Sequence, residues 1–159
     1  MPAFLEENVR WHEALAAACR DSGARVLYCA PTNHNPTTAV MPLKRRQAIT
    51  ALCRKHGVSI IENGALAPLI AEAPPPLAAL APERTYYIGS LSKATLPALR
   101  IGFIRAPAAA RPTLESAAGA TVWSASPLLA EIATQWIEDG TAAAIRDARR
   151  SEAAARQGD

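Results

Sequence analysis

The chain has 159 residues, half of them hydrophobic, which suits one globular domain with a buried core and excludes a disordered chain. The net charge of +3, with no long basic run, does not indicate a nucleic-acid-binding protein. No apolar run reaches the roughly 18 residues of a membrane span, and the N-terminus lacks the apolar segment of a signal peptide.

The cysteines and histidines give no metal-site pattern. Cys19, Cys29 and Cys53 are odd in number and lack paired-ligand spacing, so we expect free or buried thiols in a reducing cytoplasm. The three histidines are scattered along the chain, and we expect no metal site.

The first predicted elements are a helix, a strand and a loop. Residues 5–21 have the apolar spacing of an amphipathic helix, and Gly23 follows as a stop. Residues 25–29, RVLYC, are short, apolar and β-prone, which predicts a buried strand. Residues 30–38, APTNHNPTT, are dense in turn formers and predict a loop.

A second helix is predicted over residues 42–56, with Gly57 as its C-terminal stop. Its apolar residues are expected to face the core: Leu43, Ile49, Leu52 and Cys53. Its basic residues are expected to face outward: Lys44, Arg45, Arg46, Arg54 and Lys55.

Three more strands are predicted at residues 58–62, 85–88 and 101–106, and a long proline-rich loop at residues 63–84. The remainder is expected to be helical, with a single helix from Thr141 onward. The expected helix breaks are Gly119, Pro127 and Gly140.

This order of elements predicts an α/β fold. We expect a three-layer α/β/α arrangement around a mostly parallel sheet with right-handed crossovers, because strands this apolar need cover on both faces. Ligands of such sheets bind at the carboxyl ends of the strands. Three loops rich in polar residues leave those ends: residues 32–38, 62–67 and 89–100.

The loop GSLSKATLPALR, residues 89–100, allows three interpretations. It can be a solvated turn. Its S-x-x-K spacing from Ser90 to Lys93 matches a serine-acylating motif, but the partner motifs S-D-N and K-T-G do not occur in the chain. Its hydroxyls, lysine and arginine also suit a phosphorylated aldehyde, because they can bind the phosphate and form an imine; pyridoxal phosphate has both groups.

Three stretches in order resemble a known family. NHNPTT at residues 33–38, IIENGALAPL at 60–69 and IGSLSKATLPALRIGFIRAP at 88–107 are similar to motifs of fold-type I pyridoxal-phosphate enzymes, the aspartate aminotransferase superfamily. Within it, they are most similar to the aminotransferase-like domain of MocR-group regulators of the GntR type. The resemblance covers about residues 26–140.

The resemblance implies a role for each motif residue. Lys93 would form the imine with the cofactor and later shuttle the substrate proton. Asn35 would hydrogen-bond the cofactor's phenolic oxygen, with Pro36 fixing its turn; taken alone, Asn35 also suits an Asx turn. The remaining residues would hold the cofactor phosphate: Ser90, Ser92 and Arg100.

The chain departs from the family pattern at the ring nitrogen of the cofactor. Family members place an aspartate there, which keeps that nitrogen protonated; this chain has Asn63, with Gly64 as the neighbouring possibility. Strand alternation points Glu62, the only nearby carboxylate, away from position 63. Leu66 stands where many members have a tyrosine. We therefore expect weaker electron withdrawal than in the family's enzymes.

The resemblance also sets expectations for the organisation of the chain. Family members are much longer and usually homodimeric. We expect residues 1–140 to be a partial large, pyridoxal-phosphate-binding domain and residues 141–159 to be a helical tail leading toward a small domain. A partial sheet of this kind would leave an exposed edge, which favours association.

Three functions remain open. The first is amino-group transfer between an amino acid and a 2-oxo acid. The second is an effector-sensing module of a MocR/GntR-type regulator, with the same cofactor but without turnover and without direct nucleic-acid contact. The third is a structural remnant that binds nothing.

Overall fold

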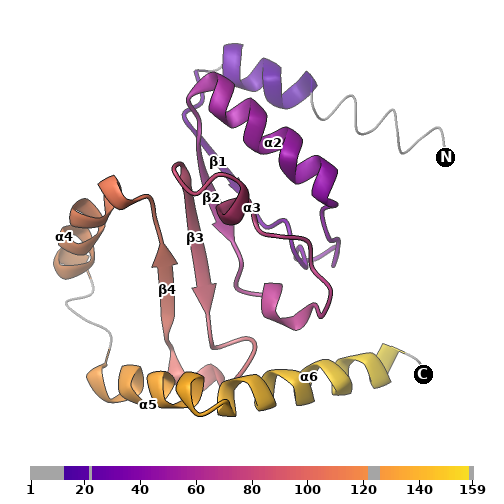
Figure 1. Ribbon diagram of the computed structural model, residues 1–159, viewed down its shortest axis with the longest axis vertical. Helices are drawn as coiled ribbons and strands as arrows, with labels where there is room; N and C mark the ends of the chain where they lie inside the picture. Colours follow the sequence, from indigo (N-terminus) through magenta and orange to yellow (C-terminus); the bar gives the residue numbers. More distant parts are fainter. Residues whose placement is uncertain (1–12, 22, 122–125, 158–159) are drawn as a thin grey trace.

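The computed structural model describes residues 13–21, 23–121 and 126–157 (Figure 1). A helical segment at residues 13–21 precedes the sheet. The strands are β1 (Val26–Cys29), β2 (Ser59–Asn63), β3 (Thr85–Ser90) and β4 (Gly102–Arg105). The α-helices after β1 are α2 (Leu43–His56), α3 (Leu77–Leu80), α4 (Arg111–Thr121), α5 (Pro127–Glu138) and α6 (Thr141–Gln157). The 3₁₀ turns are η1 (Ala67–Leu69), η2 (Pro97–Leu99) and η3 (Ala108–Ala110).

The four strands form one sheet in the order β1-β2-β3-β4. β1, β2 and β3 are parallel, with Tyr28 opposite Ile61 and Ile61 opposite Tyr86. β4 runs antiparallel to β3, because the connection between them, residues 91–101, has no crossover helix to carry the chain back for a parallel strand. The expected mostly parallel α/β sheet is confirmed.

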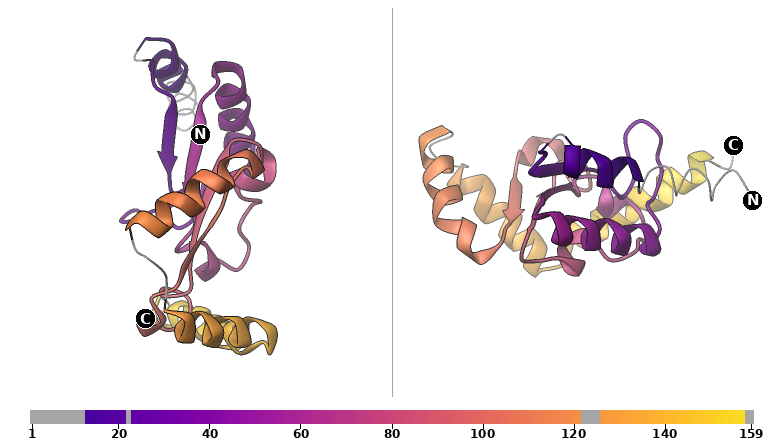
Figure 2. Two further views of the ribbon diagram at one scale, coloured as in Figure 1. Left: turned by 90° about the vertical axis from the view of Figure 1, so that its left-hand side faces the viewer. Right: turned by 90° about the horizontal axis from the view of Figure 1, so that it is seen from above.

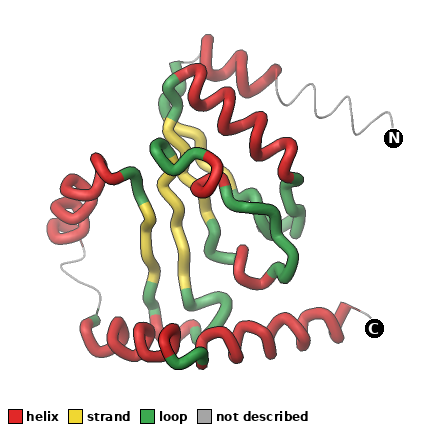
Figure 3. Tube along the Cα trace, viewed as in Figure 1, coloured by secondary structure: helices red, strands yellow, loops and turns green. Residues whose placement is uncertain are grey.

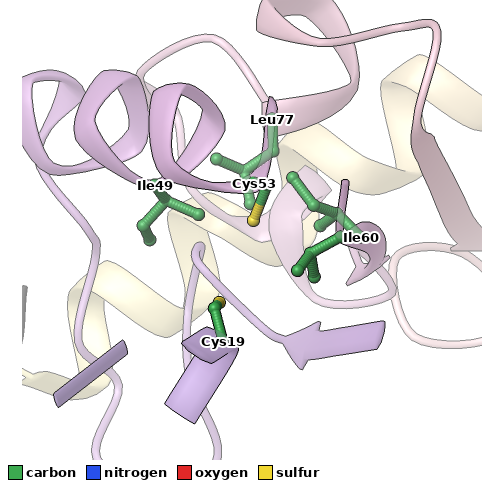
Figure 4. Packing of buried hydrophobic residues seen from close by; sticks show 6 residues of the cluster. Cys19, Ile49, Cys53, Ile60 and Leu77 are labelled. Carbon is green, nitrogen blue, oxygen red and sulfur yellow. The ribbon is translucent and has the colours of Figure 1, made fainter. Parts of the chain in front are cut away.

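One hydrophobic core joins the helices to the sheet. In Figure 4, Ile49 and Cys53 of α2 and Leu77 of α3 gather around Ile60 of β2, with Cys19 of the first helical segment beside them. These side chains are almost entirely shielded from solvent. The face of β2 that carries Ile60 is therefore the covered face of the sheet.

The opposite face of β1 is open. Val26 and Tyr28 are 55% and 60% exposed, whereas Leu27 and Cys29, pointing the other way, pack against the core. The expectation of a buried first strand is therefore wrong for half of its residues. β4 is exposed along its whole length.

The boundaries of α2 follow the prediction, but two of its residues do not. Pro42 precedes the helix and Gly57 ends it in the left-handed conformation at φ 68°. Leu43 was expected in the core and is exposed, because it lies in the first turn beyond the sheet-facing stripe. Arg46 was expected outside and is completely buried, because backbone carbonyls surround its guanidinium.

The last helices lie at the end of the sheet where the parallel strands finish. Figures 1 and 2 show α5 and α6 at the opposite end of the sheet from residues 13–21, and α6 contacts η1. Pro127 begins α5 and Gly140 precedes α6, as predicted, and α6 is a single helix. Gly119 lies inside α4 and breaks nothing, so that prediction is wrong. In the part of the chain described, no helix is both long and apolar enough to cross a membrane.

The predicted helix over residues 5–21 is helical from residue 13; its earlier residues lie outside the described ones. The proline-rich loop over residues 63–84 contains η1 and the short helix α3. Figure 3 shows long loops leaving the carboxyl ends of β1, β2 and β3, at the edge where the sequence predicts a site.

Candidate functional site

A cleft of about 980 Å³ lies at the carboxyl ends of β1 and β2. Three of the predicted site residues line it: Asn35 from the loop after β1, Asn63 from the end of β2, and Lys93 from the loop after β3. Tyr28 of β1 and Leu66, which precedes η1, also line the cleft. Residues that are up to 65 positions apart in the sequence therefore converge on one cleft.

Buried Arg46 holds both ends of the loop that carries Asn35. Its Nη2 donates to the carbonyl oxygen of Pro31 at 2.9 Å and to Thr32 Oγ1 at 2.8 Å. Its Nε donates to the carbonyl oxygen of Met41 at 2.8 Å. A third nitrogen, Nη1, donates to the carbonyl oxygen of Pro75 at 3.2 Å. One side chain thus ties the loop to α2 and to the segment before α3.

Backbone hydrogen bonds close the turn around Asn35. The amide of His34 donates to the carbonyl oxygen of Ala39 at 3.0 Å, and the amide of Thr38 donates to the carbonyl oxygen of His34 at 2.6 Å. The Asn35–Pro36 peptide bond is cis. Among the described residues, the Asn35 side chain has no hydrogen-bond partner. Its amide is therefore open to a ligand in the cleft.

Asn63 makes two hydrogen bonds that fix its amide. Its Oδ1 accepts from the backbone N–H of Ala65 at 3.1 Å, and its Nδ2 donates to Tyr28 Oη at 2.8 Å. The neighbouring carboxylate, Glu62, lies on the opposite face of β2, as alternation predicts. There it accepts from the amides of Leu77 and Ala78 at 3.1 and 2.9 Å.

Burial governs the titration of the acidic groups near the cleft. It raises the pKa of Glu62 above its ordinary value, although the two amide hydrogen bonds and the charge of Arg46 act in the other direction. Burial, with the charge of Glu62, raises the pKa of Cys29 to about 12. The Cys29 thiol therefore stays protonated and is unsuited to act as a nucleophile.

The loop after β3 places Lys93 in the cleft and its neighbours beside it. Ser90 Oγ accepts from the amide of Ser92 at 3.1 Å and donates to the carbonyl oxygen of Ile101 at 3.4 Å. Arg100 ends η2 in the left-handed conformation at φ 51°. Ser90, Ser92 and Arg100 flank Lys93 in this loop but lie outside the lining of the cleft.

Both cations of this loop are open to an anion. Within the described ranges, the side chains of Lys93 and Arg100 are exposed and have neither a hydrogen bond nor an ion pair. No group of three or more His, Cys, Asp or Glu side chains in the described part of the chain is placed to hold a metal ion. The cleft thus offers an amine and two amides to an anionic organic ligand, and the exposed guanidinium of Arg100 lies in the same loop as Lys93 but outside the lining.

Sequence reasoning missed three residues that shape the site. Tyr28 was taken only as part of an apolar strand, and Arg46 as a solvent-facing helix residue. Arg150 of α6 donates to the carbonyl oxygens of Pro68 and Ile70 at 2.8 and 3.1 Å, which anchors the loop that contains Leu66. Strand register, if known, would have indicated Tyr28, because it lies on the same face of the sheet as Asn63. The contact of Arg150 with Ile70 spans 80 residues and leaves no local signal in the sequence.

Comparison with known proteins decides the family. Residues 9–157 match the family described as aminotransferase class I and II. The chain belongs to this family. An HTH-type transcriptional regulator of Bacillus subtilis, YdeF, is 31% identical over 137 residues, which cover 86% of this chain and 30% of the regulator. A 2-aminoadipate transaminase of Thermus thermophilus is 34% identical over 97 residues, covering 57% of this chain and 24% of that enzyme.

Solved structures of the family share the fold. A multiple substrate aminotransferase from Thermococcus profundus superposes with a TM-score of 0.81 at 24% identity, over 90% of this chain and 37% of that one. The four-stranded sheet and its helices therefore correspond to part of an aspartate aminotransferase-like large domain. The chain spans about a third of the length of this structure and of the YdeF regulator.

Proposed function

We propose that this chain forms part of the pyridoxal-phosphate site of an aminotransferase-like protein, with Lys93 as the residue that carries the cofactor. The observation that carries the proposal is the convergence of Lys93, Asn35 and Asn63 on one cleft at the carboxyl ends of the strands. The donor set fits the ligand: an amine for the aldehyde, amides for the ring substituents, and a guanidinium with hydroxyls for the phosphate.

Each residue has a defined task in this proposal. The Lys93 amine binds the aldehyde carbon and later takes or returns a proton at the substrate α-carbon. The open amide of Asn35 orients the ring through its phenolic oxygen. The residues that hold the phosphate are Ser90, Ser92 and Arg100. When bound, pyridoxal phosphate supplies an aromatic ring that withdraws electrons from an attached amino acid.

The proposed reaction is the transfer of an amino group between an amino acid and a 2-oxo acid. The free cysteines agree with a reducing compartment, and we place the protein in the cytoplasm. In the same proposal, residues 1–140 are part of the large domain, residues 141–159 lead toward a small domain, and the intact protein is a homodimer. The family likeness and the single helix α6 support this division.

A second function is favoured by one specific observation, the uncharged amide at position 63. An effector-sensing module of a MocR/GntR-type regulator needs the cofactor to bind amines but does not need fast proton removal. The similarity to an HTH-type regulator supports this alternative. In that case the amino acid is an effector rather than a substrate.

The test of the proposal is chemical attachment at Lys93. Pyridoxal phosphate is added to the full chain, the mixture is reduced with borohydride, and the modified peptide is identified by mass spectrometry. We expect label on Lys93 and its loss in Lys93→Ala. Lys44→Ala is the matched control, because Lys44 is an exposed lysine of α2. Label that is absent, or that survives in Lys93→Ala, contradicts the proposal.

The two functions differ in the fate of the cofactor after an amino acid is added. An enzyme converts bound pyridoxal phosphate to pyridoxamine phosphate when an amino acid is added, and a sensor exchanges amines without that conversion. Chromatography of the released cofactor, after incubation with a panel of amino acids, separates them.

A further inference from the structure

Among the described residues, no group accepts the second Nδ2 hydrogen of Asn63. A backbone N–H can only donate, so the atom that receives the Ala65 N–H must be Oδ1. The nitrogen Nδ2 then lies toward Tyr28 Oη at 2.8 Å, and one of its two hydrogens remains for a ligand. Position 63 therefore offers an N–H where the aspartate of other family members offers a carboxylate.

Tyr28 completes a pair of donors with Asn63. Its hydroxyl oxygen accepts from Asn63, so its own hydrogen is free to donate. The sheet builds this pair: Tyr28 is opposite Ile61, and Asn63 lies two residues further along β2 on the same face. Tyr28 is 60% exposed and lines the cleft together with Asn63.

Among the described lining residues, no carboxylate would compensate a positive charge on the cofactor ring. The described residues that line the cleft include Lys93 but neither an aspartate nor a glutamate. The carboxylate next in sequence, Glu62, is on the other face of β2 and accepts two backbone amides there. The lining also includes the imidazole of His34, the thiol of Cys29 and the phenol of Tyr28, and none of these is a carboxylate.

We infer that the Asn63–Tyr28 pair binds the ring nitrogen of pyridoxal phosphate in its unprotonated form. This inference rests on the proposed cofactor site at Lys93. A pyridine nitrogen has one in-plane lone pair, which can accept one hydrogen, from Asn63 Nδ2 or from Tyr28 Oη, when it is unprotonated; a protonated nitrogen is itself a donor and can accept from neither. The cation Lys93 and the lack of a carboxylate in the described lining also favour the neutral ring, because a positive charge on the ring would be repelled and not compensated.

The consequence concerns the chemistry that the site supports. A neutral ring withdraws electrons more weakly than a protonated one, so removal of the α-proton from an attached amino acid becomes slow. Binding of an amine at the cofactor aldehyde does not need that withdrawal. The pair therefore tunes this site toward reversible amine recognition, which suits a sensor of amino compounds better than a fast transaminase.

The decisive measurement is the nitrogen NMR resonance of the ring in the bound state. Pyridoxal phosphate labelled with ¹⁵N in the ring is bound to the full chain at neutral pH. We expect the resonance of an unprotonated pyridine nitrogen in the wild type and that of a protonated one in Asn63→Asp. A wild-type resonance in the protonated range overturns the inference while leaving attachment at Lys93, and hence the proposed function, intact. Failure of attachment overturns both.

The role of Tyr28 is tested by binding rather than by activity. Tyr28→Phe removes one hydrogen bond, so the Kd for pyridoxal phosphate is expected to rise by about three- to tenfold. The control is Tyr86→Phe, a tyrosine on the same face of the sheet but outside the cleft. Equal Kd values for the two variants exclude Tyr28 from the pair.

An analogue that is methylated on the ring nitrogen gives an independent check. It carries a fixed positive charge and no lone pair, so the wild type is expected to bind it less tightly than pyridoxal phosphate. Asn63→Asp should narrow or reverse that preference, because its carboxylate attracts the charge. A wild type that prefers the methylated analogue contradicts the inference.

Discussion

Arg46 and Glu62 are the two charged side chains that are buried among the described residues. Arg46 ties the loop that carries Asn35 to α2, and Glu62 ties the start of α3 to β2. Both act through backbone groups that burial would otherwise leave without partners. Single residues thus fix the loops that frame the cleft.

Replacing Arg46 by Met is expected to lower the free energy of unfolding by about 2–4 kcal/mol, because it leaves buried carbonyl oxygens without donors. Lys44→Met is the control, since Lys44 is exposed on the same helix, and it should change stability by less than about 0.5 kcal/mol. Urea denaturation measures both values. Equal losses in the two variants would show that the Arg46 hydrogen bonds contribute little.

Glu62 is expected to make stability depend on pH in a defined direction. Because its pKa is raised in the folded state, mainly by burial, the folded protein holds this proton more tightly than the unfolded chain. The contribution of Glu62 to the free energy of unfolding is complete below the ordinary pKa of a glutamate, and it is lost as pH rises through the raised pKa of the folded state. Relative to Glu62→Gln, which does not titrate, the wild type should therefore lose stability as pH rises.

Denaturation of the wild type and Glu62→Gln from about pH 4 to about pH 8 tests this, since the folded-state pKa of Cys29, which depends on Glu62, lies well above this range. The raised pKa is contradicted if the difference in free energy of unfolding between the wild type and Glu62→Gln stays constant with pH. It is also contradicted if the wild type gains stability relative to the variant as pH rises.

The sequence predicts the residues that line the cleft better than it predicts the residues that hold them in place. Asn35, Asn63 and Lys93 follow predicted strands in recognisable motifs, so their meeting in one cleft was expected. Arg46 was misplaced because helical periodicity treats an arginine as a surface residue and does not register the carbonyls that surround it. Tyr28 was missed because its role depends on strand register, which local pattern does not set.

Among the elements, α2 shows how a glycine is used at a helix end. Gly57 has φ 68°, where a residue with a Cβ is strained, and the space around its Cα is open. Gly119, inside α4, also has open space but is not in the left-handed region. The two positions therefore differ in backbone conformation and not in crowding.

Substitution by alanine at these two positions should have opposite effects. Gly57→Ala is expected to destabilise by about 1 kcal/mol, because alanine is unfavourable in the left-handed conformation. Gly119→Ala is expected to stabilise by roughly 0.5–1 kcal/mol, because alanine is the better helix former. Thermal or urea denaturation gives the signs directly. Shifts of the same sign would show that backbone conformation does not decide the outcome.

The elements themselves were largely predictable, and their surroundings were not. The apolar runs locate all four strands to within two residues, and Pro127 and Gly140 locate the boundaries of α5 and α6. The cover over β1 could not be deduced, because an apolar run looks the same in a buried strand and in one with an open face. The antiparallel direction of β4 likewise depends on the path of the connection at residues 91–101, which an apolar run does not reveal.

At both edge strands, the face of the sheet opposite the core is open. Val26 and Ile104 are each 55% exposed, and they lie on the edge strands β1 and β4. By alternation both point to the face that carries Tyr28 and Ile61. Exposed apolar side chains on edge strands favour association between copies of a chain.

We therefore expect the isolated chain to self-associate as its concentration rises, through this open face. The double variant Val26→Lys with Ile104→Lys should remain monomeric to higher concentration, because two charges on the face oppose its burial. A matched control places the same two charges on exposed positions of α6, as Ala144→Lys with Ala148→Lys. Sedimentation velocity over a concentration series compares the three proteins. If the α6 variant suppresses association as strongly as the sheet variant, net charge is responsible and the open face is not the contact.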